Sequence, residues 1–140
     1  MRRLGKNISQ FDLLYNSNMA EPFSSSVHSV PVSVQRIQLL NQVPESDTLW
    51  VAAVAGWRTV VNSRELSHND LCVWHEPDTQ VDAFNPVYDF LAKNKHYVGT
   101  IVIKGITSSG LAMPLSFFQQ QLEPVAGRLE EGLDLTALLK

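Results

Sequence analysis

The sequence predicts an all-β domain, a small antiparallel barrel of short strands with one short helix before the last two strands. Three observations support this fold class. Apolar and polar residues begin to alternate at Pro31, as they do in half-buried strands. The strand-like segments are short and rich in β-branched and aromatic residues, and turn residues separate them about every ten positions. Such spacing favours a small barrel over a sandwich of longer strands.

Four strands are expected in the first half of the domain. Residues 32–37 show the alternation of a half-buried strand. Residues 49–54 and 57–61 are two apolar strands, and the Ala55-Gly56 pair between them is a hairpin signal. Residues 71–75 form the next apolar segment, which completes this half of the predicted barrel.

A short helix is expected at residues 86–93. Asn85 stands where a helix cap is needed, and Pro86 stands at the first helical position. Strands, one short helix and two more strands follow one another as in an oligonucleotide-binding (OB) barrel. The chain is expected to end in two strands and two short helical segments, at residues 97–104, 111–115, 117–122 and 133–139.

The predicted organisation has three parts. Residues 1–29 form a flexible N-terminal tail, residues 30–115 form the OB-like barrel, and residues 116–140 form a C-terminal extension that leads out of the barrel. The basic start at residues 1–6 resembles a mitochondrial transit peptide. A plain tail, a targeting segment and an alternative start at Met19 all stay open for this region.

Composition limits the possible functions. The net charge of −3 argues against a strongly basic nucleic-acid binder, so any RNA contact must be a local patch. Cys72 has no second cysteine to pair with, which is compatible with a reducing compartment. No apolar stretch approaches the roughly 20 residues that span a bilayer. We therefore expect an intracellular protein without membrane contact, cytoplasmic or, as a minor alternative, mitochondrial.

The run Lys104–Gly110 is the main candidate for ligand contact. Its glycines let the backbone approach a ligand or adopt positive φ, and the N–H groups of such a turn can form a concave anion site. We expect Lys104 to supply charge and the hydroxyls to bond phosphate or ribose. The alternative is a structural polar hairpin between two strands. The candidate hydroxyl residues are Thr107, Ser108 and Ser109.

Basic and aromatic residues outside this run are further candidates. Lys93 and Lys95 follow the expected helix, where they could form a solvated face or border one groove with Lys104. Arg58 could join them in RNA contact. Trp57 could fill the barrel floor or serve as a stacking platform at its rim. Two other tryptophans, Trp50 and Trp74, are expected to pack inside the barrel.

The sequence indicates neither a metal site nor a catalytic residue. Its histidines lack paired i, i+4 spacing and there is no Cys-x-x-Cys, which disfavours a structural metal. No Gly-x-Ser-x-Gly elbow surrounds Ser108 or Ser109, which disfavours a nucleophilic serine. The residues weighed and rejected as metal ligands are His68, His75, Glu76, Asp78 and His96.

Several motifs carry a family resemblance. They are the strand at 32–37, the acidic loop at 44–47, Ala55-Gly56-Trp57, residues 69–74, the run at 104–111 and the stretch at 131–139. In this order they resemble the N-terminal module of the ATP-dependent RNA ligases typified by the Deinococcus and Naegleria enzymes. The most specific parts of the resemblance are Gly56-Trp57 and residues 104–115.

The resemblance implies an RNA-binding module that positions an RNA end or nicked duplex. In that family a separate nucleotidyltransferase domain seals a 3′-hydroxyl to a 5′-phosphate with ATP and a divalent metal, and its Lys-x-Asp-Gly lysine is joined to AMP. No lysine of this chain is followed by x-Asp-Gly. We therefore expect no cofactor and no sealing by this chain alone, which could be a fragment or a stand-alone module. The alternative is a non-enzymatic OB-like scaffold making protein contacts in a larger complex, which the acidic balance favours.

Overall fold

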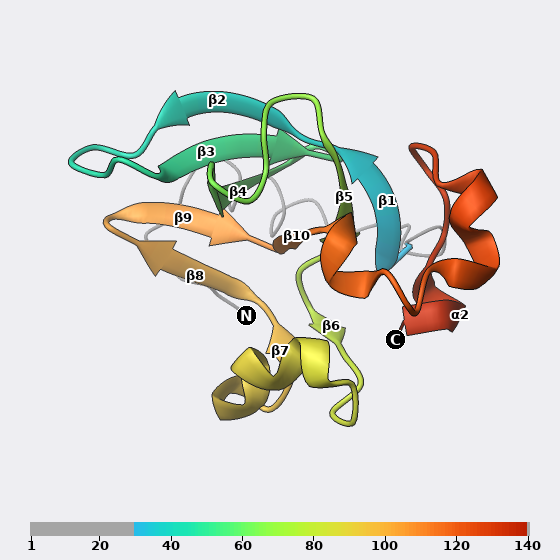
Figure 1. Cartoon of the computed structure of the whole chain (residues 1–140). Coiled ribbons are helices and arrows are strands. Elements are labelled where there is room, and N and C mark those ends of the chain that lie inside the picture. The colour runs from blue at the N-terminus through green and yellow to red at the C-terminus, as the bar shows by residue number, and fades with distance from the viewer. Residues whose placement is uncertain (1–29, 140) are drawn as a thin grey trace, which may run out of the picture.

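The protein is described by a computed structural model over residues 30–139, and the predicted N-terminal tail lies outside the described residues. The fold is all-β, with antiparallel strands and a few short helices (Figure 1). The predicted fold class is therefore confirmed. The described strands are β1 (Val32–Arg36), β2 (Gln38–Gln42), β3 (Leu49–Val54), β4 (Trp57–Asn62), β5 (Leu71–His75), β6 (Thr79–Gln80), β7 (Tyr97–Val98), β8 (Thr100–Ile103), β9 (Ile106–Ser109) and β10 (Leu111–Pro114).

Short helices lie between the strands and after them. The 3₁₀ helix η2 (Pro86–Asn94) separates β6 from β7. It starts where the sequence predicts, because the Asn85 side chain accepts a hydrogen bond from the Val87 N–H at 3.1 Å. After β10 come two 3₁₀ helices, η3 (Leu115–Phe118) and η4 (Glu123–Arg128), and the α-helical turn α2 (Thr136–Leu139).

The longer strands follow one another in a ring. β5 pairs with both β1 and β10, and β3 pairs with both β2 and β4. Only Ile37 separates β1 from β2, so one bent strand passes from the first sheet to the second. β9 lies beside β4 and leads through Gly110 into β10. In this ring, hydrogen-bonded ladders join β1 to β5, β5 to β10, β2 to β3 and β3 to β4, the chain itself joins β1 to β2 and β9 to β10, and β4 and β9 have no ladder.

Two hairpins have the same tight turn. Ala55 and Gly56 have φ of 51° and 87°, and Lys104 and Gly105 have φ of 50° and 82°. Positive φ at both central residues defines a type I′ turn, whose twist matches that of the flanking strands. The predicted hairpin at Ala55-Gly56 is confirmed.

The structure corrects the prediction for the end of the barrel. The turn expected over Lys104–Gly110 is limited to Lys104 and Gly105, because the following residues form β9. The single strand expected at 97–104 is two strands, β7 and β8, which break at Gly99. The sequence prediction also missed β2 and β6, since β2 is mostly exposed and β6 has only two residues.

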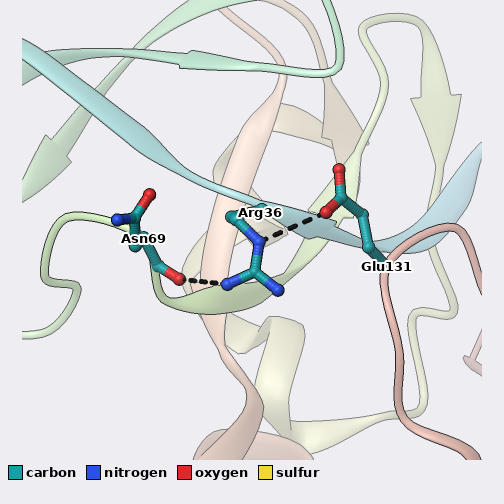
Figure 2. Close-up of polar contacts among 3 residues, drawn as sticks. All are labelled: Arg36, Asn69 and Glu131. Carbon is teal, nitrogen blue, oxygen red and sulfur yellow. Dashed lines mark hydrogen bonds and ion pairs between the residues drawn. The ribbon is translucent and has the colours of Figure 1, made fainter.

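The C-terminal extension packs against β1. The Val34 N–H donates to the Leu133 carbonyl at 2.9 Å, and the Leu135 N–H donates to the Val32 carbonyl at 2.8 Å. Figure 2 shows Arg36 at the end of this contact, where its guanidinium donates to a Glu131 carboxylate oxygen at 3.2 Å and to the Asn69 carbonyl at 2.7 Å. The ion pair is exposed and contributes little by itself. Residues from the extension that join the core of β1 and β5 are Phe118, Leu122, Leu135 and Leu139.

Gly110 is the tightest point of the backbone. Its φ is +83°, and a Cβ atom added there would lie 2.4 Å from the Trp74 ring and 2.8 Å from the His75 carbonyl oxygen. A side chain at this position therefore meets both left-handed backbone strain and a fully buried ring. Only glycine lets the chain pass from β9 to β10 over β5.

We predict that Gly110→Val lowers the free energy of unfolding by about 3 kcal/mol or more, the sum of backbone strain and overpacking. Gly105→Ala is the matched control, because Gly105 also has positive φ but its added Cβ would meet nothing within 4 Å. That control should cost only about 1 kcal/mol. Urea unfolding of both variants measures the difference, and equal losses would contradict the steric account.

Candidate nucleic-acid interface

The run Lys104–Gly110 divides into an exposed turn and a buried part. We call the contact of the buried part with β4 the seam. Lys104 and Gly105 are exposed at the turn between β8 and β9, and Thr107 is half-buried. Ser108 and Ser109 are only 3% and 1% exposed. The two serine hydroxyls that the sequence suggests for ligand contact are therefore covered by the protein.

Ser108 bonds β9 to β4. Its Oγ accepts a hydrogen bond from the Val60 N–H at 2.9 Å and lies 3.2 Å from Thr59 Oγ1. The Val60 N–H points away from β3, because antiparallel pairs alternate and Thr59 and Val61 occupy the hydrogen-bonded positions of the β3–β4 hairpin. A backbone N–H that is partly withdrawn from solvent needs a partner, and the Ser108 hydroxyl supplies it where no ladder exists.

Ser109 has an equivalent structural role on the other side of β9. Its Oγ accepts a hydrogen bond from Thr100 Oγ1 at 3.1 Å, which ties β9 to β8. We correct the expected exposure of Ser108 and Ser109 for this reason: both hydroxyls bond neighbouring strands. Of the predicted contact residues in the run, Lys104 is the exposed one and Thr107 is partly accessible.

The predicted basic residues are exposed but come from three elements. Arg58 lies on β4, Lys93 lies in the last turn of η2, and Lys95 caps that helix with φ of 57°. Lys104 lies at the hairpin tip. Because β4 and β9 run antiparallel, Arg58 and Lys104 lie on opposite sides of the Ser108–Val60 contact along the seam.

The three tryptophans differ in burial. Trp74 is fully buried, as predicted for an interior residue. Trp50 is only half-buried, although it packs against the core cluster that includes Trp74. Trp57 is also half-buried against that cluster, so the residue packs on the core while part of its surface stays accessible.

His75 is a core histidine that holds η2 against β5. Its Nδ1 lies 3.1 Å from the Leu111 carbonyl oxygen and its Nε2 lies 2.7 Å from the Tyr88 hydroxyl. A carbonyl only accepts, so Nδ1 carries the proton and the Tyr88 hydroxyl donates to Nε2. Desolvation lowers the pKa of His75 to about 4, although the bond to Leu111 opposes the shift. The ring is therefore neutral at pH 7.

Burial also makes Cys72 unreactive. Desolvation is the main cause that raises the pKa of its thiol to about 12, so the nucleophilic thiolate is scarce at neutral pH. Among residues 30–139, no three His, Cys, Asp or Glu side chains gather closely enough to hold a metal ion. No helix in this described range is long and apolar enough to cross a membrane.

Comparisons with known proteins identify relatives of this fold. A family model described as an OB-fold domain matches residues 31–115. The structure is similar to Naegleria gruberi RNA ligase with PPi, with a TM-score of 0.67 and 21% sequence identity, over 79% of this chain and 34% of that chain. A mutant of that ligase with ATP and Mn and an apo mutant give the same values. This chain thus spans about a third of the ligase, and no curated protein sequence matches it.

We predict that Ser108→Ala lowers the free energy of unfolding by about 1 kcal/mol, because it leaves the partly buried Val60 N–H without its hydroxyl partner. Ser116→Ala, at an exposed position in η3, is the control and should change stability by less than about 0.5 kcal/mol. Chemical denaturation of the two variants tests this. A neutral effect of Ser108→Ala would show that the hydroxyl does not hold the seam.

We also predict a pH dependence from His75. Its pKa falls from an ordinary 6.5 to about 4 in the folded protein, so the unfolded chain binds more protons between these values. Stability is fully present above about pH 6.5 and falls by about 3 kcal/mol as the pH drops through 4. Unfolding measured from pH 7 to pH 4 should show this slope in the wild type and a shallower slope in His75→Gln. Identical slopes would contradict the assignment.

Proposed function

The chain belongs to the OB-fold domain family, and from this premise we propose that it is an RNA-binding module. It would hold an RNA end or a nicked duplex while a separate catalytic domain seals the strand with ATP and a divalent metal. The observation that carries this proposal is the likeness of the whole fold to RNA ligase, over 79% of this chain.

We assign RNA contact to this chain and catalysis to a separate domain because of the residues that this chain contains. It corresponds to 34% of the ligase chain, and none of its lysines is followed by x-Asp-Gly. A nucleotidyl transfer needs an activated nucleophile and groups that stabilise the developing charge. In our proposal the catalytic domain supplies both, and this module supplies RNA contact.

The exposed hairpin tip is the proposed centre of that contact. A type I′ turn projects Lys104 from the end of two strands, where its ammonium can meet a phosphate without loss of core packing. Arg58, Lys93 and Lys95 are further exposed cations, and the accessible part of Trp57 could stack on a base. With about three or four phosphates neutralised, the log–log salt slope would be about −2 to −3.

A scaffold role is the second candidate, and one observation favours it. β8 exposes large apolar side chains, with Ile101 55% and Val102 63% exposed. Exposed apolar surface on a strand is more typical of protein contact than of nucleic-acid contact. In that case the barrel would make protein contacts in a larger complex.

We predict that Lys104→Asn weakens binding to a nicked RNA duplex by about three- to tenfold at low salt, as expected for one phosphate contact of about 1 kcal/mol. Asparagine removes the charge but tolerates the positive φ of this turn position. Fluorescence anisotropy at two salt concentrations measures the change. Arg128→Ala, an exposed cation in η4, is the control and should bind like the wild type. If the wild type and Lys104→Asn bind the nicked duplex with equal affinity, the RNA contact at Lys104 is contradicted and the scaffold role is favoured.

A further inference from the structure

β8 has an open outer edge. It lies on the outside of the β8–β9 hairpin (Figure 1), and among the described residues it pairs only with β9. Residues 100–103 read Thr-Ile-Val-Ile, with no charge and no proline. Proteins usually protect an open edge with charges, proline or a bulge, because its unpaired backbone groups can accept another strand. This edge has none of these devices.

The backbone groups that point outward can be identified. The Gly110 N–H donates to the Gly99 carbonyl at 3.1 Å, which fixes which residues of β8 bond β9. Antiparallel pairs alternate, so Ile101 bonds β9. Thr100 and Val102 therefore direct their N–H and C=O groups away from β9, toward the open edge.

The open edge is closed at one end. By the same alternation Val98 directs its backbone groups to this side, and there β6 already occupies the position. Val98 pairs with Thr79, and its carbonyl accepts a hydrogen bond from the Asp78 N–H at 2.7 Å. A strand on the β8 edge must therefore leave the sheet beside Gly99, whereas at the other end it can run past Lys104.

The chain carries a segment whose sequence matches this edge. Residues 1–29 lie outside the described residues, and among them the run richest in apolar residues is Phe-Asp-Leu-Leu-Tyr at 11–15. One antiparallel register sets its only charge opposite a charge of the hairpin. The pairs of that register are Asp12 with Lys104, Leu13 with Ile103, Leu14 with Val102, Tyr15 with Ile101 and Asn16 with Thr100.

Neighbouring registers match less well. The register above combines an opposite-charge pair, three apolar pairs and a polar pair, which are the cross-strand pairs that stabilise a sheet. A shift of one residue sets either Asp12 or Asn16 opposite an isoleucine. A shift of two residues sets Asp12 opposite an apolar residue in one direction and Leu14 opposite Lys104 in the other. The side chains of the edge therefore favour one register of this segment.

The chain between this segment and β1 is long enough to reach the edge. The Pro31 carbonyl accepts from the Glu76 N–H at 2.9 Å, and the Asp78 N–H donates to the Val98 carbonyl at 2.7 Å. Allowing for the short peptide links between these bonds, Pro31 lies within about 20 Å of the start of β8. The residues from Asn16 to Pro31 can span about 50 Å when extended. The connection therefore needs less than half of its maximum length.

The direction of the strand agrees with this connection. An antiparallel segment in the favoured register ends with Asn16 at the closed end of the edge, which is the end nearer to Pro31. The next residues are Ser17 and Asn18, two residue types that favour turns, so the chain can leave the sheet where β6 blocks it. Because the segment is tethered, its effective concentration at the edge exceeds that of a second copy or a separate peptide at ordinary protein concentrations.

We propose that residues 12–16 add a strand to the open edge of β8 in the same chain. Asn16 and Leu14 bond the outward N–H and C=O groups of Thr100 and Val102, as in other cases of strand addition. The added strand covers an edge that would otherwise accept foreign strands. The proposal does not depend on the proposed RNA contact, so either can fail without the other.

Amide hydrogen exchange of the full chain tests the proposal. The N–H groups of Thr100 and Val102 should be protected, and in a chain that starts at Met19 they should exchange at least about tenfold faster. The Ile101 N–H faces β9 and should exchange equally in both chains, which checks that the hairpin is intact. No protection of Thr100 and Val102 in the full chain, or protection that survives the deletion, would overturn the proposal. Protection that rises with protein concentration would assign the edge to a second copy and overturn it as well.

Leu14→Pro tests the paired run without a deletion. Proline has no N–H to donate to the Val102 carbonyl and is excluded from a paired position, so Thr100 and Val102 should exchange as in the chain that starts at Met19. Ser9→Pro changes a residue outside the paired run and is the matched control, which should behave as the wild type. Equal exchange in the two proline variants would contradict the proposed pairing.

A disulfide tests the register. Tyr15→Cys combined with Ile101→Cys places two Cα atoms about 4.5 Å apart in a non-hydrogen-bonded pair, within the roughly 4.4–6.8 Å that a disulfide bridges. Native Cys72 is buried. Under mild oxidation this pair should close within one chain at least about tenfold faster than Tyr15→Cys combined with Phe117→Cys, whose Phe117 position is 46% exposed. Equal rates for the two pairs would overturn the register.

Discussion

One hydroxyl group, that of Ser108, holds β9 against β4. β4 and β9 lie side by side without a ladder, and Ser108 Oγ accepts a hydrogen bond from the partly buried Val60 N–H. Gly110 then lets the chain turn over the Trp74 ring into β10. Because these two contacts position the β8–β9 hairpin, they also affect where Lys104 projects and which edge of β8 stays open. The contact between β4 and β9 therefore connects the core to two exposed features, the projecting Lys104 and the strand β8.

Much of the fold is predictable because its signals are local. Ala55-Gly56 marks a two-residue turn, and Asn85 and Pro86 mark a helix start, so the structure agrees at both places. The run at 104–110 is harder, because its hydroxyls look suited to solvent or a ligand. Ser108 bonds a residue 48 positions earlier in the chain, and nothing in the neighbouring sequence reveals that partner. For the same reason the pairing of the C-terminal extension with β1 could not be read from the sequence.

The candidate interface is consequently smaller than the sequence suggests. Two of its hydroxyls bond neighbouring strands, Ser108 to β4 and Ser109 to β8. Its cations are spread over β4, the exit of η2 and the hairpin tip. A protein with net charge −3 that contacts RNA through such a set must depend on a few phosphates and on help from a neighbouring domain. In our proposal that domain is the rest of an RNA ligase, because the fold is similar to about a third of the Naegleria gruberi enzyme. The RNA contact leaves the apolar edge of β8 unused, so RNA binding and strand pairing at that edge can use different surfaces.

The most direct test of this account is residue-resolved amide hydrogen exchange at Val60 under native conditions. In the wild type its N–H should be protected, although β4 has no ladder on that side. In Ser108→Ala its exchange should accelerate far more than that of the Val61 N–H, which faces β3. Equal acceleration at both amides, or no protection of Val60 in the wild type, would contradict the claim that the Ser108 hydroxyl holds β9 against β4.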